Sequence, residues 1–352
     1  MTVKVDNFWG LMTMSFVLLA SGSGRDIYFR PRIRDSTRPT YAPKWRGVEY
    51  LRRRTPIQSL RSLNHSSVHL PHLLNMRFDY KALFAASLAF LGLVSAAYPW
   101  QARHGMTSDD YQNTFNSLVG QGYRLTDVSG YTINNDPRFA AIWVQEPSPA
   151  WVARHGMTAS DYQTNFNTYV AQGYRPVLVN GYTVNGTPYF AAIWDKSPST
   201  GWVARHGMTS AQYQSAFDTY VAQGYRLRWV SGYAQGNTDY YAAIWEKPST
   251  NVAWVAHHGM TSAQYQSYFD QYTSQGYRPI LVGGYVVNNV DSYVAIWDKS
   301  PSGAWVARHG MTSQGYQTEF DNWVSQGYTL TVVSGYTLNG NQDKYAALWY
   351  KE

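Results

Sequence analysis

The sequence predicts an α+β fold of five tandem β-α-β-β repeats of about 51 residues, arranged as one closed ring or a curved half-barrel with a shared core. Three observations predict it: regularly spaced tryptophans, a helix-capping pattern after each one, and two apolar strands that end each copy. The tryptophans lie 51, 51, 52 and 51 residues apart, at Trp100, Trp151, Trp202, Trp254 and Trp305. The repeats so defined span 100–150, 151–201, 202–253, 254–304 and 305–352.

Each repeat opens with a predicted strand and continues into a helix. Residues 151–158 read Trp-Val-Ala-Arg-His-Gly-Met-Thr. The oxygen of Thr158 can accept from a free amide of the first helical turn while Asp161 reaches back, which is a capping box; only the fifth copy, with Gly315, lacks the return partner. Gly173 stands where a left-handed residue ends a helix. The apolar spacing i, i+4, i+7, i+8 places one stripe on this helix: Tyr162, Phe166, Tyr169 and Val170.

Two further strands complete the unit. Residues 225–233 and 240–245 flank an Asn/Gly/Asp loop in the third copy, which predicts a hairpin. The Ala-Ala-Ile-Trp strand is apolar on both faces, so we expect it to be buried between layers and to pair with the Trp strand of the following copy. The first Trp strand, at Trp100, and the last strand, 345–349, are then left without partners. Pairing them removes two sheet edges and favours closure.

The N-terminal 96 residues differ from the repeats. Residues 82–96 are an apolar or small run after Arg77 and Lys81, too short for a transmembrane helix of roughly 20 residues. We therefore predict a signal peptide at 76–96, a secreted mature chain of 97–352, and a disordered 1–75 that belongs to an over-extended gene model. The alternative is a signal at residues 9–20 with an internal anchor at the later run.

Composition excludes several classes of function. Residues 97–352 contain 15 Lys and Arg and 17 Asp and Glu, a net charge of −2, so this part lacks the basic stripe that nucleic-acid binding requires. Cysteine is absent, which excludes disulfides and thiolate sites. We expect no cofactor, no nucleic-acid partner, and no membrane partner after signal cleavage.

One titratable pair recurs in every copy, an arginine or histidine followed by a histidine. These candidate binding residues are Arg103 and His104, Arg154 and His155, Arg205 and His206, His257 and His258, and Arg308 and His309. At helix N-termini they could bind anions or carboxylates; alternatively, each histidine hydrogen-bonds locally and fixes the strand-to-helix turn. No second ligand type recurs at metal-binding spacing, so we expect no metal. Asn185 is a candidate glycosylation site, although Pro188 follows its acceptor triplet.

The recurring Trp-Val-Ala-Arg-His-Gly-Met-Thr, Gln-Gly-Tyr-Arg, Ser-Gly-Tyr and Ala-Ala-Ile-Trp blocks over residues 100–352 resemble the bacterial tandem repeat domain family. They are also similar to the N-terminal repeat domain of fungal polyglycine hydrolases, secreted proteases with a separate catalytic domain related to serine β-lactamases. The resemblance implies a non-catalytic domain. No lysine follows a serine by three residues, the spacing a β-lactamase-like nucleophile needs.

The sequence thus predicts a secreted, non-catalytic repeat module that binds an extracellular protein or a cell-wall polysaccharide. The alternative is the accessory domain of a polyglycine-hydrolase-like serine protease whose β-lactamase-like catalytic domain is missing from this chain. A third class, a carbohydrate-active enzyme, needs paired carboxylates facing one cleft. Its candidates stand at helical positions that we expect to be solvated: Asp109, Asp110, Asp161 and Asp218.

Overall fold

The computed structural model describes residues 3–7, 10–16, 31–32 and 98–351, in two separate units, Met1–Ala96 and Ala97–Glu352. The first unit contains an antiparallel sheet of β1 (Val3–Asn7), β2 (Gly10–Phe16) and β3 (Pro31–Arg32). These strands are the described part of the stretch expected to be disordered. The predicted signal peptide at 76–96 lies outside the described residues.

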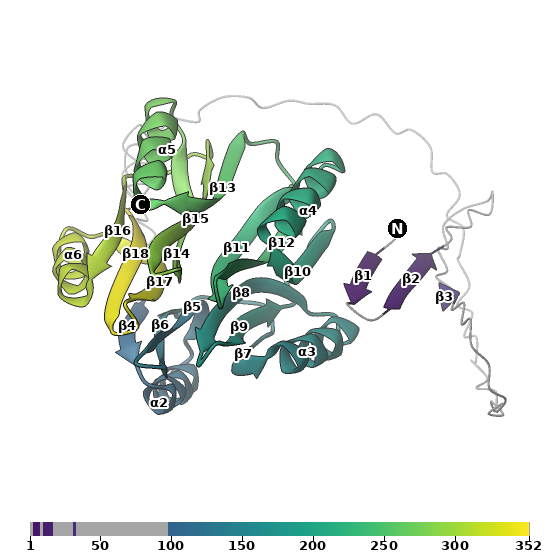
Figure 1. The fold of residues 1–352 in the computed structure, drawn as a ribbon, viewed down its shortest axis with the longest axis horizontal. Coiled ribbons are helices and arrows are strands. Elements are labelled where there is room, and N and C mark those ends of the chain that lie inside the picture. The colour runs from purple at the N-terminus through teal and green to yellow at the C-terminus, as the bar shows by residue number, and fades with distance from the viewer. Residues whose placement is uncertain (1–2, 8–9, 17–30, 33–97, 352) are drawn as a thin grey trace, which may run out of the picture. The chain divides into compact units, whose positions relative to one another are not determined.

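The second unit consists of five β-α-β-β repeats, as predicted (Figure 1). The first strands are β4 (Trp100–Met106), β7 (Trp151–Thr158), β10 (Trp202–Thr209), β13 (Trp254–Thr261) and β16 (Trp305–Thr312). The helices are α2 (Ser108–Gly120), α3 (Ala159–Ala171), α4 (Ser210–Ala222), α5 (Ser262–Ser274) and α6 (Ser313–Ser325). The second strands are β5 (Arg124–Ile133), β8 (Arg175–Val184), β11 (Arg226–Gln235), β14 (Arg278–Val287) and β17 (Thr329–Leu338). The third strands are β6 (Asp136–Val144), β9 (Thr187–Asp195), β12 (Thr238–Glu246), β15 (Val290–Asp298) and β18 (Gln342–Tyr350).

The predicted helix caps are present. Thr158 Oγ1 accepts a hydrogen bond from the amide of Asp161, whose carboxylate accepts one from the Thr158 amide. The same capping box is present at the N-termini of α2, α4 and α5. In α6 only the first of these two hydrogen bonds is present, donated by the Gly315 amide to Thr312 Oγ1. Gly173, with φ +82°, ends its helix in the left-handed conformation that glycine adopts at least cost. Capping chemistry alone therefore fixes both helix ends.

The prediction that a Trp strand pairs with the preceding copy was wrong. Each sheet has three antiparallel strands in the order first, third, second, so Trp202 lies opposite Glu246 of its own repeat. The hairpin places the third strand beside the second, and the other edge of the third strand pairs with the first strand, which precedes the helix in the chain. The sheets are accordingly five separate three-stranded sheets, and no strand of the first repeat pairs with one of the fifth within the described residues.

The core lies between repeats as well as within them. The Ala-Ala-Ile-Trp strand is buried on both faces, as expected, with Ala242 and Trp245 both 0% exposed. Each helix covers its own sheet and packs on the back of the next one, as Phe166 of α3 packs on Trp202 of β10 with ring centroids 5.9 Å apart. The buried side chains form four clusters rather than the single shared core that was expected.

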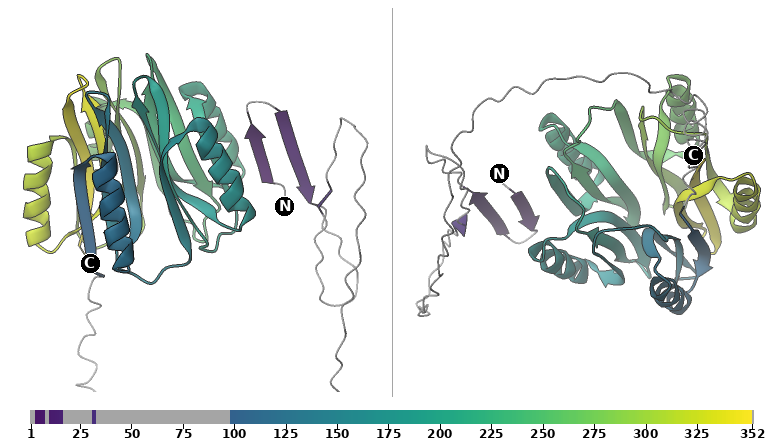
Figure 2. Two further views of the ribbon diagram at one scale, coloured as in Figure 1. Left: turned by 90° about the horizontal axis from the view of Figure 1, so that it is seen from below. Right: turned by 180° about the vertical axis from the view of Figure 1, so that it is seen from behind.

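The second strands face one another at the centre of the unit, with the helices outside (Figures 1 and 2). The glycine of the Gly-Tyr pair in each second strand lies against the tyrosine of the next repeat: a Cβ on Gly181 would lie 2.3 Å from Cδ1 of Tyr233. No real Cβ approaches that closely, so only glycine fits. At four of the five interfaces the glycine amide also donates to a side chain of the next repeat, as Gly181 does to Ser231 Oγ at 3.1 Å; at the remaining interface the equivalent residue is Gly283, which has no side chain.

The fifth repeat contacts the first through the same set of interactions. A Cβ on Gly335 would lie 2.5 Å from the ring of Tyr131, and the Gly335 amide donates to Ser129 Oγ at 3.0 Å. The amide of Val333 donates to the buried carboxylate of Asp127 at 2.8 Å, a contact particular to this pair of repeats. Direct contacts therefore run between all five neighbouring pairs, the fifth with the first included.

Candidate binding site at the central axis

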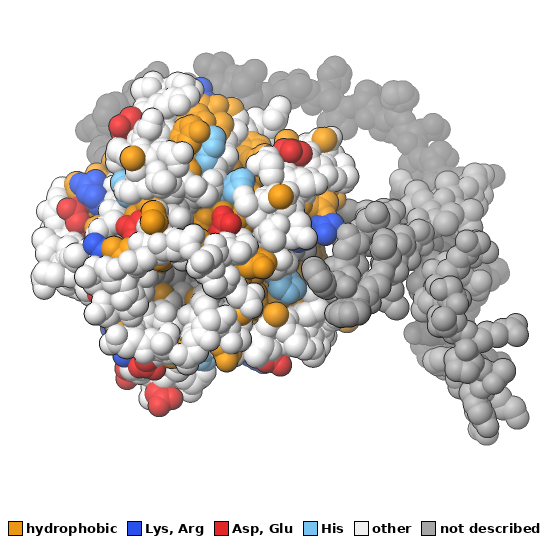
Figure 3. Space-filling model, viewed as in Figure 1, with side chains coloured by type: hydrophobic (Ala, Val, Ile, Leu, Met, Phe, Trp, Pro, Cys, Tyr) orange, Lys and Arg blue, Asp and Glu red, His pale blue; other side chains and the backbone are white. Residues whose placement is uncertain are grey.

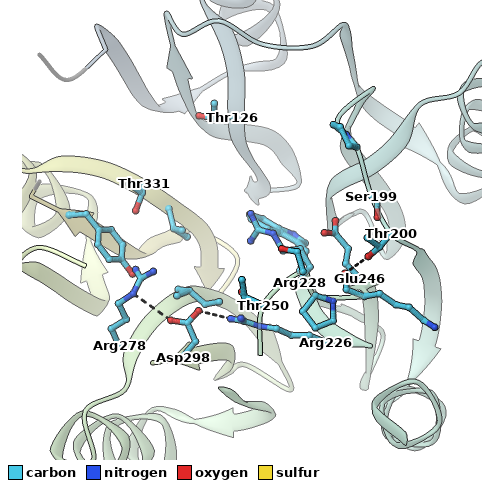
Figure 4. A pocket seen from close by; sticks show the side chains of 18 residues that line it. Thr126, Ser199, Thr200, Arg226, Arg228, Glu246, Thr250, Arg278, Asp298 and Thr331 are labelled. Atoms are coloured by element: carbon cyan, nitrogen blue, oxygen red, sulfur yellow. Dashed lines mark hydrogen bonds and ion pairs between the residues drawn. The ribbon is translucent and has the colours of Figure 1, made fainter. Parts of the chain in front are cut away.

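A cavity of about 920 Å³ opens where the second strands begin and the loops between repeats end (Figure 4). Its walls come from four of the five second strands and from the loops around 198–200 and 247–250. Further along, the space between the second strands narrows to about 20 Å³, room for roughly one water molecule. The cavity is therefore a blind cup, of a size typical of small-ligand sites.

A β-bulge directs side chains into this cup. In every second strand the register shifts at the third residue, which has no cross-strand partner. Bulges re-aim such a side chain away from the sheet. Four of the five bulge residues line the cavity: Thr126, Arg228, Ile280 and Thr331.

The arginines at the rim are ion-paired between repeats. Arg226 contacts Asp298 of the next repeat at 2.5 Å, and Arg278 contacts the same carboxylate at 3.4 Å. Arg175 pairs in the same way with Glu246 of the next repeat. Burial raises the pKa of Asp298, but hydrogen bonds from Ser300 and Arg226 outweigh it and hold that pKa below its usual value. Both acidic groups of the cup are thus engaged with arginines.

Arg228 is the exception. Its guanidinium forms no hydrogen bond or ion pair with any residue that the structure describes, and water in the cup reaches it. Figure 4 shows it projecting between Arg226 and the wall that carries Thr126. The protein around the cup desolvates the guanidinium, which lowers its pKa; the nearby Glu246 opposes the shift and Arg226 adds to it. Arg228 is therefore the one guanidinium lining the cup that no carboxylate of the described residues pairs with directly; the other cation without a carboxylate partner there, Lys247, lies over the Tyr225 ring.

The neighbours of Arg228 are held rigidly. The indole Nε1 of Trp229 donates to the Val179 carbonyl at 3.0 Å, which fixes the ring at the wall. The hydroxyls of Thr126 and Thr331 donate to carbonyls of their own sheets at 3.2 and 3.3 Å. Their lone pairs remain free to accept from a ligand.

Charge is concentrated at this site rather than spread over the domain. The cup is lined by four cationic side chains and two carboxylates, a local charge of +2 in a domain of −2. On the face seen in Figure 3, lysine and arginine form only small separate patches. The field at the cup therefore favours a small anionic group over a nucleic-acid backbone.

The recurrent histidines lie between repeats. His155 packs edge-on against Tyr111 of the preceding repeat at 4.7 Å, and equivalent contacts occur at His104, His206, His258 and His309. His258 Nε2 lies 3.1 Å from Ser210 Oγ, at the first residue of the preceding helix. Burial lowers the pKa of all five histidines, that of His206 to about 4, so they are neutral near pH 7.

The residue before each of these histidines points to the opposite face of its strand, as alternation requires. Arg205 Nε donates to Tyr220 Oη of its own helix at 2.6 Å, and Arg308 pairs with Glu319 at 3.0 Å. Arg154 lies over the Tyr169 ring. In the fourth copy His257 stacks on Tyr268, and in the first Arg103 donates to the Ala102 carbonyl. The structure therefore separates the two members of each pair, and none lines the cup.

The remaining candidates serve local structure. Asp110 and Asp161 complete capping boxes, and Asp218 accepts from Gln214 at 2.8 Å; Asp109 lies in the first turn of α2. Asn185 is exposed at a hairpin turn with φ +49°. Within the described residues, no group of three His, Cys, Asp or Glu side chains could hold a metal ion, and no helix has the length and apolarity needed to cross a bilayer.

Sequence reasoning missed Arg228 because it followed residues that recur. The bulge position reads Thr126, Val177, Arg228, Ile280 and Thr331. Alignment of the five second strands would have revealed Arg228, because it is the one charged residue at a position that is uncharged in the other four repeats.

The repeats match a known family along the whole second unit. The family described as polyglycine hydrolase-like, structural repeat matches five times, at residues 97–146, 148–197, 199–248, 251–300 and 302–352. On the strength of these five tandem matches, the chain belongs to the polyglycine hydrolase-like structural repeat family.

Proposed function

We propose that residues 97–352 form a closed ring of five repeats that is secreted and binds an extracellular protein or polysaccharide in the axial cup, without catalysing a reaction. The observation that carries the proposal is Arg228, an unpaired guanidinium in a rigid cavity whose other arginines are paired. A guanidinium without a carboxylate partner is free to pair with a negatively charged group of a ligand.

Ring closure is supported by the contacts between the fifth and first repeats. Gly335 and Tyr131 interlock as the corresponding residues do at the other interfaces. Closure leaves no terminal repeat with an uncovered apolar face, which an open array needs special capping repeats to protect.

The absence of catalysis is supported by the state of the acidic groups in the cup. A general acid or base needs a pKa near the working pH. The pKa of Asp298 is instead lowered, and Glu246 is engaged by Arg175. Both carboxylates therefore stabilise the ring rather than exchange protons with a substrate.

A binding screen with the secreted chain tests the proposal. Candidate polysaccharides and extracellular proteins are presented to the chain and to Thr250→Trp, which places a large side chain at the exposed rim of the cup. Ser302→Trp is the matched control, since Ser302 is equally exposed in a loop between repeats but does not line the cup. Binding lost in Thr250→Trp and kept in Ser302→Trp supports the proposal. Ligands retained equally by both variants would refute the cup as the site.

Secretion has its own test. Mass spectrometry of the extracellular protein should find a first residue at Ala97 or next to it, as cleavage after Ala96 requires. A mature form beginning near residue 21 would instead favour the signal at 9–20.

A second candidate follows from the family. The polyglycine hydrolase-like description supports an accessory domain that acts with a β-lactamase-like serine protease on another chain. If so, adding the chain to such a protease should raise the rate at which it cleaves a glycine-rich linker. If the cup holds the substrate, the Thr250→Trp variant should raise that rate less than the wild-type chain does. An unchanged cleavage rate would remove this candidate.

A further inference from the structure

The charge in the cup limits the ligand it can hold. Arg226 and Arg278 share the carboxylate of Asp298, so neither has a full charge to offer. Lys247 lies over the Tyr225 ring at the rim. Arg228 is the one guanidinium of the cup without a carboxylate partner among the described residues, and it can pair with a carboxylate of the ligand, while Lys247 adds a further positive charge at the rim. A planar guanidinium binds a carboxylate through two parallel hydrogen bonds.

The hydroxyls around the cup set a second requirement. The hydrogens of Thr126 and Thr331 are committed to their own sheets, and Thr200 Oγ1 donates to the Lys247 carbonyl at 2.8 Å. Each hydroxyl oxygen can therefore only accept from a ligand. A ligand that fits must present several donors beside its carboxylate.

The fixed ring of Trp229 adds an apolar wall. It is half-buried next to the bulge and held by its bond to the Val179 carbonyl. A rigid aromatic side chain contributes contact area with little loss of conformational entropy. A flat ligand face fits against it.

These three features together describe a sugar acid. We propose that the axial cup binds a uronic-acid residue of a polysaccharide, with its carboxylate on Arg228, its hydroxyls donating to Thr126 and Thr331, and its ring against Trp229. This inference rests on the proposed binding function. It favours a polysaccharide over a protein because one sugar ring carries several hydroxyl donors beside its carboxylate and a face that fits against Trp229, whereas an acidic peptide offers one backbone N–H donor per residue.

Calorimetric titration of the full chain with trigalacturonate tests the inference. Galactotriose is the neutral probe, triglutamate the peptide probe, and inorganic phosphate the simple anion. We expect trigalacturonate to bind, and to bind tighter than each of the other three by about tenfold or more, the scale of one charge-assisted pair. Equal binding of galactotriose would overturn the role of charge, and preferential binding of triglutamate or phosphate would overturn the sugar assignment.

Variants locate the interaction. Arg228→Gln should weaken trigalacturonate binding about tenfold or more, and Arg228→Lys should restore only part of it because lysine lacks the planar fork. Arg138→Gln is the matched control: it removes one guanidinium that is paired with Asp136, outside the residues lining the cup. An unchanged affinity in Arg228→Gln, with Thr250→Trp still blocking the ligand, would overturn this inference alone. If Thr250→Trp blocks no ligand at all, the proposed function falls with it.

Discussion

Replacing one glycine with alanine tests whether the fifth repeat closes on the first. In Gly335→Ala, the new Cβ would lie 2.5 Å from two ring carbons of Tyr131. The ring cannot move aside easily, because Tyr131 is 4% exposed and its hydroxyl is held by the Gly105 amide at 3.2 Å and by the Tyr345 hydroxyl at 2.5 Å. The backbone or the whole interface has to shift instead.

The expected cost follows from overpacking. Adding a methyl group to a tightly packed site destabilises a protein by about 1 to 3 kcal/mol. For a domain of this size each kcal/mol lowers Tm by roughly 2–4 °C, so we expect a fall of roughly 2–12 °C. Gly181→Ala places its Cβ 2.3 Å from Tyr233 between the second and third repeats, and should cost a similar amount.

Thermal unfolding followed by near-ultraviolet circular dichroism measures these shifts. The control is Gly120→Ala at the end of α2, where a Cβ meets nothing within 4 Å and two other helices carry alanine at the equivalent position. It should leave Tm unchanged or raise it slightly, since alanine favours helix by roughly 0.5–1 kcal/mol. A fall in Gly181→Ala with none in Gly335→Ala would show that the first and fifth repeats do not interlock in solution, and would refute ring closure.

Three further substitutions test other parts of the structure, each by thermal unfolding. Burial raises the pKa of Asp127 from 3.8 to about 7, so the stability linked to its proton is full below about pH 4 and is lost as pH rises through about 7. Asp127→Asn should remove this loss and gain on the wild type as pH rises from about 4 to about 7, with no further gain above that; parallel curves would contradict the raised pKa. Gly283→Ser should destabilise, because its Cβ would lie 2.9 Å from Val294, whereas adding Val294→Ala should restore stability and offer Gly232 a side-chain acceptor like those at the other interfaces; a double variant no better than the single would contradict this. Arg228→Gln should leave Tm nearly unchanged, since the guanidinium is exposed and forms no hydrogen bond or ion pair with the described residues, and a fall of several degrees would show that Arg228 stabilises the fold.

The local structure of each repeat could be predicted because its causes are adjacent in sequence. Thr158 and Asp161 start a helix by their own hydrogen bonds, and Gly173 ends it through a φ of +82°. The Asn185-Gly186 turn likewise depends only on residues that tolerate positive φ. These features need no knowledge of the neighbouring repeat.

Contacts between repeats could not be predicted in the same way. The apolar pattern of 240–245 indicates burial on both faces, but it does not say which strand lies on each edge, and the expected pairing with the next copy was wrong. Gly232 shows the same limit. It is bordered by the Tyr285 ring, 53 residues later in sequence, so its requirement for glycine is visible only in three dimensions.

The position of the bulge residues explains why an arginine occurs there in one repeat only. A residue repeated on the outer helices or at the interfaces appears at five separated places, as the histidines do. The bulge positions instead converge on one axis, and four of the five line a single cavity. Arginine in every copy would bring five guanidinium groups together, and their mutual repulsion in a partly desolvated space would oppose closure. An arginine without a carboxylate partner at the bulge position must therefore break the repeat, so a ligand site on this axis is to be sought at positions where one copy differs from the other four.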